Sequence, residues 1–187
     1  MLFRSRYLTL GFTHIVPHGL DHMLFVVGIF LFSRQLRTVL WQVSAFTLAH
    51  SLTLGLSIYG LLSVPSSIVE PLIAISIAYI AIENLVLTEL KPWRIGLVFA
   101  FGLLHGMGFA GALQELGLPR SEFLTALVTF NVGVEAGQLA VIGAAFLLVG
   151  WQCHREWYRG RVVVPASVLI GCTAVYWTVE RALGSWL

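Results

Sequence analysis

Six long apolar stretches fill almost all of this 187-residue chain, and they constrain its fold more than any other feature. A helix that crosses a lipid bilayer needs about 20 apolar residues, and each stretch supplies roughly that many. Only 11% of the residues are charged, against about 25% in a typical soluble domain. The sequence therefore predicts an all-α integral membrane protein, a single transmembrane domain over residues 1–187 with about six helices. The expected helices cover approximately residues 10–32, 39–62, 66–87, 93–116, 123–150 and 162–183.

The polar segments between these stretches are short, and three of them carry a proline where the next helix would begin. Pro65, Pro92 and Pro119 each stand where a helix would begin, the position at which a missing N–H is least costly. Short connections make consecutive helices antiparallel neighbours. The first stretch contains two helix breakers of its own, Pro17 and Gly19, which allow a broken first helix near its outer end.

The basic residues are distributed unequally between the two sides of the predicted bundle. Seven Lys and Arg residues fall on the side of the first, third and fifth connections, and four fall on the other side. The positive-inside rule then places both termini outside the cytoplasm. The same residues form no basic stripe, which disfavours nucleic-acid binding. No Gly-x4-Gly-Lys-Ser/Thr sequence is present, so ATP is not expected to drive this protein directly.

Several ionisable or amide side chains fall near the centres of the predicted helices. Such groups are costly in the bilayer, so they are rare there and usually face a site or a cavity. Counting about 1.5 Å per residue from the helix ends places one set at nearly the same level: Asp21, His22, His50, His105, Asn131 and Glu135. His14 and His18 would share a helical face with His22 if the first helix were continuous. Glu83 lies roughly 9 Å from the centre of its helix, towards the cytoplasm.

Imidazole and carboxylate groups at one level point to a site for a transition-metal cation. Together they suit borderline ions such as Ni²⁺, Co²⁺ and Zn²⁺. The sequence lacks the cluster of Cys and Met ligands that Cu⁺ prefers. Met23 and Met107 flank the histidines, however, so copper is not excluded as the ion. Taken alone, His50 is nearly as typical of a packing residue bonded to a neighbouring helix.

Four other polar residues have plainer explanations. His18 follows a proline near the outer surface and is typical of an interfacial residue. Glu70 precedes Pro71 in the first turn of a helix, where a carboxylate can cap N–H groups. Glu180 and Arg181 are expected to form a solvated helix end.

Several ordered motifs resemble the HupE/UreJ family, in the branch with a Gly-x-Asp-His core in its first helix. They comprise residues 11–25 around Gly19-Leu20-Asp21-His22, residues 45–54 around His50, Val69-Glu70-Pro71, Glu83-Asn84-Leu85, residues 101–106 ending in His105-Gly106, and residues 130–138 with Asn131 and Glu135. The resemblance covers about residues 10–140. It implies a secondary permease for nickel or cobalt.

The resemblance also implies roles for particular residues. The metal role passes to His14, Asp21, His22, His50 and His105, with Glu83 and Glu135 as further candidates. The expected partners are the metal ion and the lipid bilayer of a bacterial inner membrane, and a homo-oligomer is compatible with so small a chain. Protons or the membrane potential would drive transport, since a divalent cation entering down 100 mV gains about 4.6 kcal/mol.

Two other functions stay open at this stage, although a transporter is favoured over an enzyme. A zinc-dependent intramembrane hydrolase could use the same His and Asp side chains to hold Zn²⁺ and activate a water molecule. A b-type haem protein could use His50 and His105 as axial ligands. A lateral opening for lipid would favour the hydrolase, and a Soret band in the purified protein would favour the haem protein.

Overall fold

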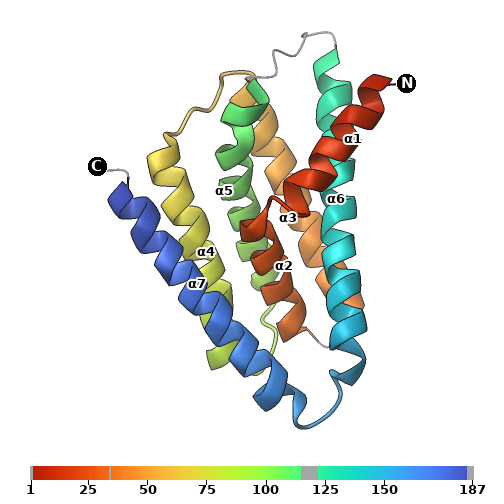
Figure 1. Cartoon of the computed structure of the whole chain (residues 1–187), viewed down its shortest axis with the longest axis vertical. Coiled ribbons are helices and arrows are strands. Elements are labelled where there is room, and N and C mark those ends of the chain that lie inside the picture. The colour runs from red at the N-terminus through yellow and green to blue at the C-terminus, as the bar shows by residue number, and fades with distance from the viewer. Residues whose placement is uncertain (1, 34, 115–121, 185–187) are drawn as a thin grey trace.

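The computed structural model describes residues 2–33, 35–114 and 122–184, and within those residues it contains helices and no strand. Its α-helices are α1 (Leu2–Ile15), α2 (Leu20–Phe32), α3 (Leu36–Ile58), α4 (Ser66–Val86), α5 (Arg94–Gln114), α6 (Phe123–Leu148) and α7 (Val164–Gly184) (Figure 1). A 3₁₀ turn (Gly150–Gln152) and a π-helical turn (Arg159–Val163) connect α6 to α7. Helices satisfy every backbone polar group internally, as lipid requires. The predicted all-α class is confirmed.

Most of these helices can cross a membrane by length and composition. Among the described residues, α3, α4, α6 and α7 with its preceding turn pass this test, and the bent pair α1–α2 passes it when its two helices are taken together as one span. Helix α5 has 21 residues, and its segment Arg94–Gly108 counts as a shorter apolar helix. The chain is therefore a multi-pass membrane protein, and six is an approximate helix count. The predicted polar break at residues 117–121, with Pro119, lies outside the described residues.

The first apolar stretch forms two helices that meet at 68°. Pro17 cannot donate a backbone N–H, so α1 ends before it. A Cβ atom at Gly19 would overlap the carbonyl oxygen of His14, so only glycine lets the start of α2 lie against the end of α1. The broken first helix is confirmed. The alternative of a continuous helix, with His14, His18 and His22 on one face, is wrong.

Helix α2 lies in the middle of the bundle and contacts α3, α4, α6 and α7. Around it the longer helices pair along their lengths, α3 with α5, α1 with α6 and α4 with α7 (Figure 1). Phe25, Val26, Ile29 and Phe30 of α2 are buried. The centre of the bundle is therefore built around the helix that follows the break.

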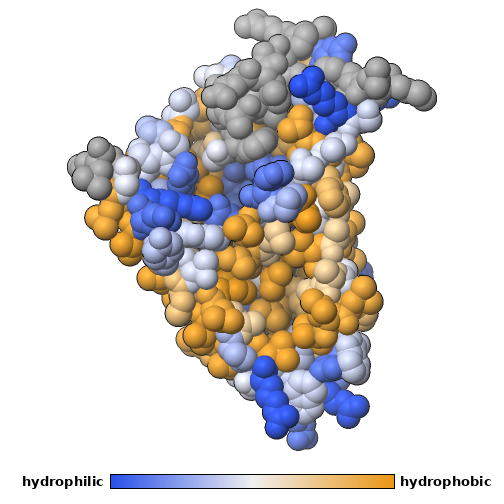
Figure 2. Space-filling view, viewed as in Figure 1, coloured by the Kyte–Doolittle hydropathy of each residue, from blue (hydrophilic) through white to orange (hydrophobic). Residues whose placement is uncertain are grey.

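Figure 2 shows a broad hydrophobic band across this face of the bundle. Hydrophilic residues gather at the lower tip and across the upper part of this face, where α7 ends and α1 meets α2. A hydrophobic belt between two polar ends is what a bilayer requires of a protein surface.

Helices α3 and α5 approach each other very closely. A Cβ atom at Gly106 would overlap the carbonyl oxygen of His50 and the hydroxyl of Thr53. The Thr53 hydroxyl also donates a hydrogen bond of 2.8 Å to the carbonyl of Leu103 on α5. Small residues allow such close helix contacts in membranes. This contact sets His50 and His105 at one height.

Candidate metal centre

Four histidines from four helices meet in the middle of the bundle. They are His14 of α1, His22 of α2, His50 of α3 and His105 of α5. The centroid of the His22 ring lies 4.7 Å from that of His14, 5.6 Å from that of His50 and 4.9 Å from that of His105. His22, His50 and His105 are buried, and His14 is half-buried. The break between α1 and α2 is what folds His14 back onto His22.

Three of these side chains are close enough to share one cation. Ligand nitrogens of His14, His22 and His50 all lie within 4.8 Å of one another. Two nitrogens on opposite sides of one cation would be about 4.2 Å apart, which is twice a metal–nitrogen bond of about 2.1 Å. Small side-chain rotations would therefore bring the three rings into contact with one ion. His105 stands beside His22 as a fourth candidate ligand.

Hydrogen bonds fix the tautomers of two of the rings. Nδ1 of His105 donates to the carbonyl of Phe101 at 2.9 Å, and Nδ1 of His50 donates to the side-chain oxygen of Asn131 at 3.4 Å. The amide nitrogen of Asn131 donates to the carbonyl of Leu127 at 2.8 Å, which turns its oxygen towards His50. Nε2 of both rings therefore presents its lone pair. Metal-binding histidines are usually oriented in this way.

The surroundings of the rings are apolar. Phe46 and Phe25 lie 4.9 Å and 5.2 Å from His105, measured between ring centroids. The Nε2 atoms of His22, His50 and His105 are buried and accept no hydrogen bond. A buried polar atom left in that state costs about 1–3 kcal/mol. A cation that took these lone pairs would remove this cost, so the donor set fits a borderline transition metal.

Asp21 adjoins the cluster in sequence but pairs with an arginine. Its two carboxylate oxygens accept hydrogen bonds of 3.0 Å and 3.1 Å from one guanidinium nitrogen of Arg181 on α7. The other terminal nitrogen of Arg181 donates to the carbonyl of Glu70 at 3.3 Å. Arg181 stands in the last turn of α7 with its side chain 21% exposed, so the expected solvated helix end also forms an ion pair that was not predicted.

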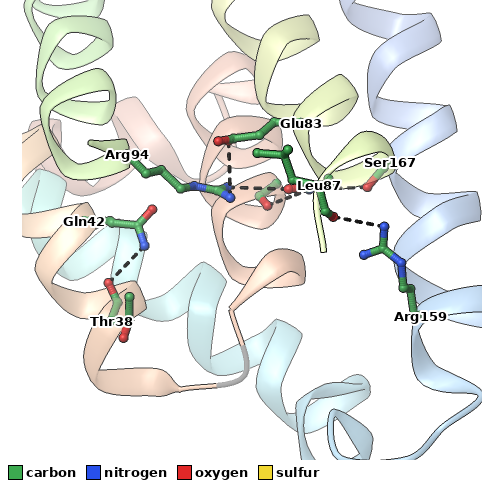
Figure 3. Close-up of polar contacts among 9 residues, drawn as sticks. Thr38, Gln42, Glu83, Leu87, Arg94, Arg159 and Ser167 are labelled. Carbon is green, nitrogen blue, oxygen red and sulfur yellow. Dashed lines mark hydrogen bonds and ion pairs between the residues drawn. The ribbon is translucent and has the colours of Figure 1, made fainter. Parts of the chain in front are cut away.

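Glu83 lies apart from the histidines, in a buried ion pair with Arg94. The pair is 3.2 Å long, and its side chains are only 3% and 1% exposed. Figure 3 shows Arg94 reaching from α5 to Glu83 on α4. Arg94 also donates to the side chain of Asn84 at 3.5 Å, and Asn84 donates to the carbonyl of Gly28 on α2 at 2.8 Å. Gly28 follows His22 along α2, so this network lies on the other side of the cluster from Asp21.

Glu135 lines a groove of about 400 Å³ between α3 and α6. The hydroxyl of Ser44 donates to its carboxylate at 2.8 Å. Asn131 lines the same groove and bonds to His50. Glu135 therefore lies one helical turn along α6 from the residue that bonds to His50.

His18 and Glu70, two of the residues with plainer explanations, lie outside the cluster. His18 is exposed in the break, where its Nδ1 donates to the carbonyl of Thr13 at 3.1 Å. Glu70 is exposed, and within the described residues no side chain caps the start of α4.

Sequence reasoning missed the importance of Arg94 and Arg181. Both fall inside the expected spans 93–116 and 162–183. An arginine within a membrane span generally needs an opposite charge, so the position of each arginine inside a span could have predicted an ion pair. Which carboxylate pairs with each arginine depends on helix packing.

A model of the family described as "HupE / UreJ protein" matches residues 3–181 of the chain. The chain belongs to the HupE/UreJ family. The match includes all four helices that carry the cluster and extends through Arg181 on α7. The HupE/UreJ family is associated with nickel and cobalt transport. No curated protein and no solved structure matches the chain.

Proposed function

We propose that this HupE/UreJ protein transports a divalent transition-metal cation, nickel or cobalt, across the membrane through the histidine cluster. The observation that carries the proposal is the meeting of four imidazoles from α1, α2, α3 and α5 in an apolar interior. The Nε2 atoms of His22, His50 and His105 are buried and have no hydrogen-bond partner among the described residues, so their lone pairs are suited to bind a cation.

The ligand chemistry supports a borderline cation. Neutral imidazole binds nickel, cobalt and zinc well, while calcium and magnesium prefer oxygen ligands. Zinc satisfies the same donors, so the choice among the three is set by availability and geometry. A route for release is also needed, and ligands drawn from four separate helices can move apart when the helices shift.

The remaining predicted site residues have separate roles in this proposal. Asp21 attracts the cation beside His22. Glu135 supports the cluster through Asn131 and His50. Glu83 lies beyond the cluster, where its pairing with Arg94 closes the path on that side.

We place the protein in a bacterial inner membrane with both termini outside the cytoplasm. Figure 1 has both termini at the same end of the bundle, which suits an even number of passes. The excess of Lys and Arg on the opposite side favours this orientation. The cation then enters from the side of Asp21 and moves down the membrane potential without direct use of ATP.

Uptake by proteoliposomes tests the proposal. The pure protein, reconstituted under an imposed negative-inside potential, should take up radiolabelled nickel or cobalt. His22→Ala and His50→Ala should each reduce uptake roughly 100-fold, because they remove ligands, and Asn131→Leu should weaken metal binding about 10–100-fold. His154→Ala is the matched control, since His154 is exposed in the α6–α7 connection, and it should keep wild-type uptake.

Absence of uptake by the wild-type protein would overturn the proposal. Equal uptake by His22→Ala and His154→Ala would remove the cluster from the transport route. A Soret band in the purified protein would point instead to haem.

A further inference from the structure

We propose that Arg181 is a tethered cation that occupies Asp21 and that an incoming divalent metal must displace. Arg181 would then set the affinity of the entrance and favour divalent over monovalent ions. This inference rests on the proposed function, because it concerns entry into the histidine cluster.

The guanidinium of Arg181 contacts both carboxylate oxygens of Asp21, which are the atoms that an incoming cation would bind. Asp21 immediately precedes His22, in the first turn of α2. One nitrogen of Arg181 lies 3.0 Å and 3.1 Å from the two carboxylate oxygens. A metal ion that binds this carboxylate therefore meets oxygens already engaged by a positive charge.

The pair is built in a way that allows exchange. The side chains of Arg181 and Asp21 are 21% and 26% exposed, so the bundle encloses neither partner. Partly exposed ion pairs contribute little net stability, because solvent replaces what the pair loses. The carboxylate can therefore change partners at small cost.

Arg181 has other contacts that can keep the guanidinium close by after it leaves Asp21. Its second terminal nitrogen donates to the carbonyl of Glu70 at 3.3 Å. Its guanidinium carbon lies 5.1 Å from the centroid of the Trp177 ring, one turn earlier on α7. The carbonyl and the aromatic face stabilise a displaced guanidinium.

Electrostatics extends the competition to the cluster. The guanidinium of Arg181 lies on the carboxylate of Asp21, and Asp21 directly precedes His22, which stands beside His105. A cation among the histidines and a guanidinium at Asp21 therefore repel each other, and each weakens the binding of the other. Exchange replaces one positive charge by two at Asp21, so a divalent ion competes better than a monovalent one.

Metal titration of the purified full-length protein in detergent tests this competition, with Ni²⁺ and Zn²⁺ as the probes. The variants are Arg181→Gln, which removes the charge, and Arg181→Lys, which keeps it. Arg159→Gln is the matched control, because Arg159 donates to the backbone carbonyls of Leu85 and Leu87 at the far end of the same helical segment, away from Asp21.

Arg181→Gln should bind metal roughly fivefold tighter or more than the wild type, within the usual range of coupling between two sites. Arg181→Lys should stay near the wild-type affinity, and Arg159→Gln should not change it. Weaker or unchanged binding by Arg181→Gln, in a preparation whose melting temperature matches that of Arg159→Gln, would overturn the inference. A wild-type protein that binds no metal would instead overturn the proposed function.

Tryptophan emission gives a second readout that a purely structural role would not move. Zn²⁺ should shift the emission of the wild type, because the guanidinium moves relative to Trp177, and this shift should be lost in Trp177→Phe. It should also be lost in Arg181→Gln, although that variant binds Zn²⁺. An equal shift in Arg181→Gln and the wild type would contradict displacement.

Discussion

Two carboxylate–arginine pairs lie on either side of the histidine cluster, and they differ chiefly in their access to water. Asp21 and Arg181 are about a quarter exposed, whereas Glu83 and Arg94 are almost completely buried. The pair of Asp21 and Arg181 joins α2 to α7 beside the break in the first span. The pair of Glu83 and Arg94 joins α4 to α5, at the level of the later part of α2. The same two functional groups therefore make an exchangeable contact in one place and a fixed one in the other.

The buried pair is embedded in contacts that hold its charges in place. The Arg94 guanidinium carbon lies 4.4 Å from the centroid of the Phe32 ring, and Arg94 also bonds to Asn84. Asn84 in turn bonds to Gly28 of α2 and to Ser167 of α7. Two buried charges need such support because water no longer stabilises them. This network links four helices on the side of the histidine cluster away from Asp21.

The largest expected effect comes from breaking the buried pair. Arg94→Met leaves Glu83 as an uncompensated charge in the interior and should lower the free energy of unfolding by about 3–5 kcal/mol. Thermal and denaturant unfolding in detergent, followed by circular dichroism, measures this change. A loss below about 1 kcal/mol would mean that the two pairs are energetically alike.

The double variant Glu83→Leu with Arg94→Met should recover most of that loss. Replacing both members of a buried pair with apolar side chains removes the unpaired charge and is often neutral, or stabilising by about 1–4 kcal/mol. The same unfolding measurement compares it with the single variant. If the double variant is no more stable than Arg94→Met, the charge pairing does not explain the effect.

Asp21→Asn should change stability by less than about 1 kcal/mol, because its ion pair is partly exposed. Its effect should appear in transport. Loss of a negative charge at the entrance should slow uptake at low metal concentration by roughly tenfold, since charged entrances raise the local concentration of counter-ions. Proteoliposome uptake and unfolding of the same preparation test both parts. A large loss of stability would show that this pair is structural.

The smallest effect is expected from salt. At about 1 M ionic strength, exposed charges more than about 3 Å apart are largely screened. The small stability difference between the wild type and Asp21→Asn should therefore vanish in high salt, while the difference for Arg94→Met should persist. Equal salt sensitivity of the two differences would contradict the contrast in exposure.

The sequence predicted the helices well because a membrane span is a local property. Among the described residues, four helices are long and apolar enough to cross the bilayer, and Pro65 directly precedes α4. The expected boundaries 66–87 and 123–150 agree closely with α4, Ser66–Val86, and α6, Phe123–Leu148. Pro17 and Gly19 likewise indicated the break in the first helix, because both act on the backbone at their own positions.

The site was only partly predictable. Depth along each helix placed His22, His50 and His105 at one level, since the rise per residue is fixed. The carboxylates were harder to place. Glu83 and Asp21 were expected among the metal ligands, and in the structure each pairs with an arginine from a helix distant in sequence.

By itself the sequence indicated which segments are apolar enough to enter a membrane and predicted that His22, His50 and His105 lie at a similar level, because hydrophobic length and helical rise follow from the order of residues alone. Only the tertiary structure decided the partners of the charged groups. Whether Asp21 pairs with Arg181 depends on where α7 packs against α2. Whether Glu83 is buried in an ion pair with Arg94 depends on where α5 begins beside α4. Electrostatic pairing acts over a few ångströms, and such distances are set by the packing of helices and not by their order along the chain.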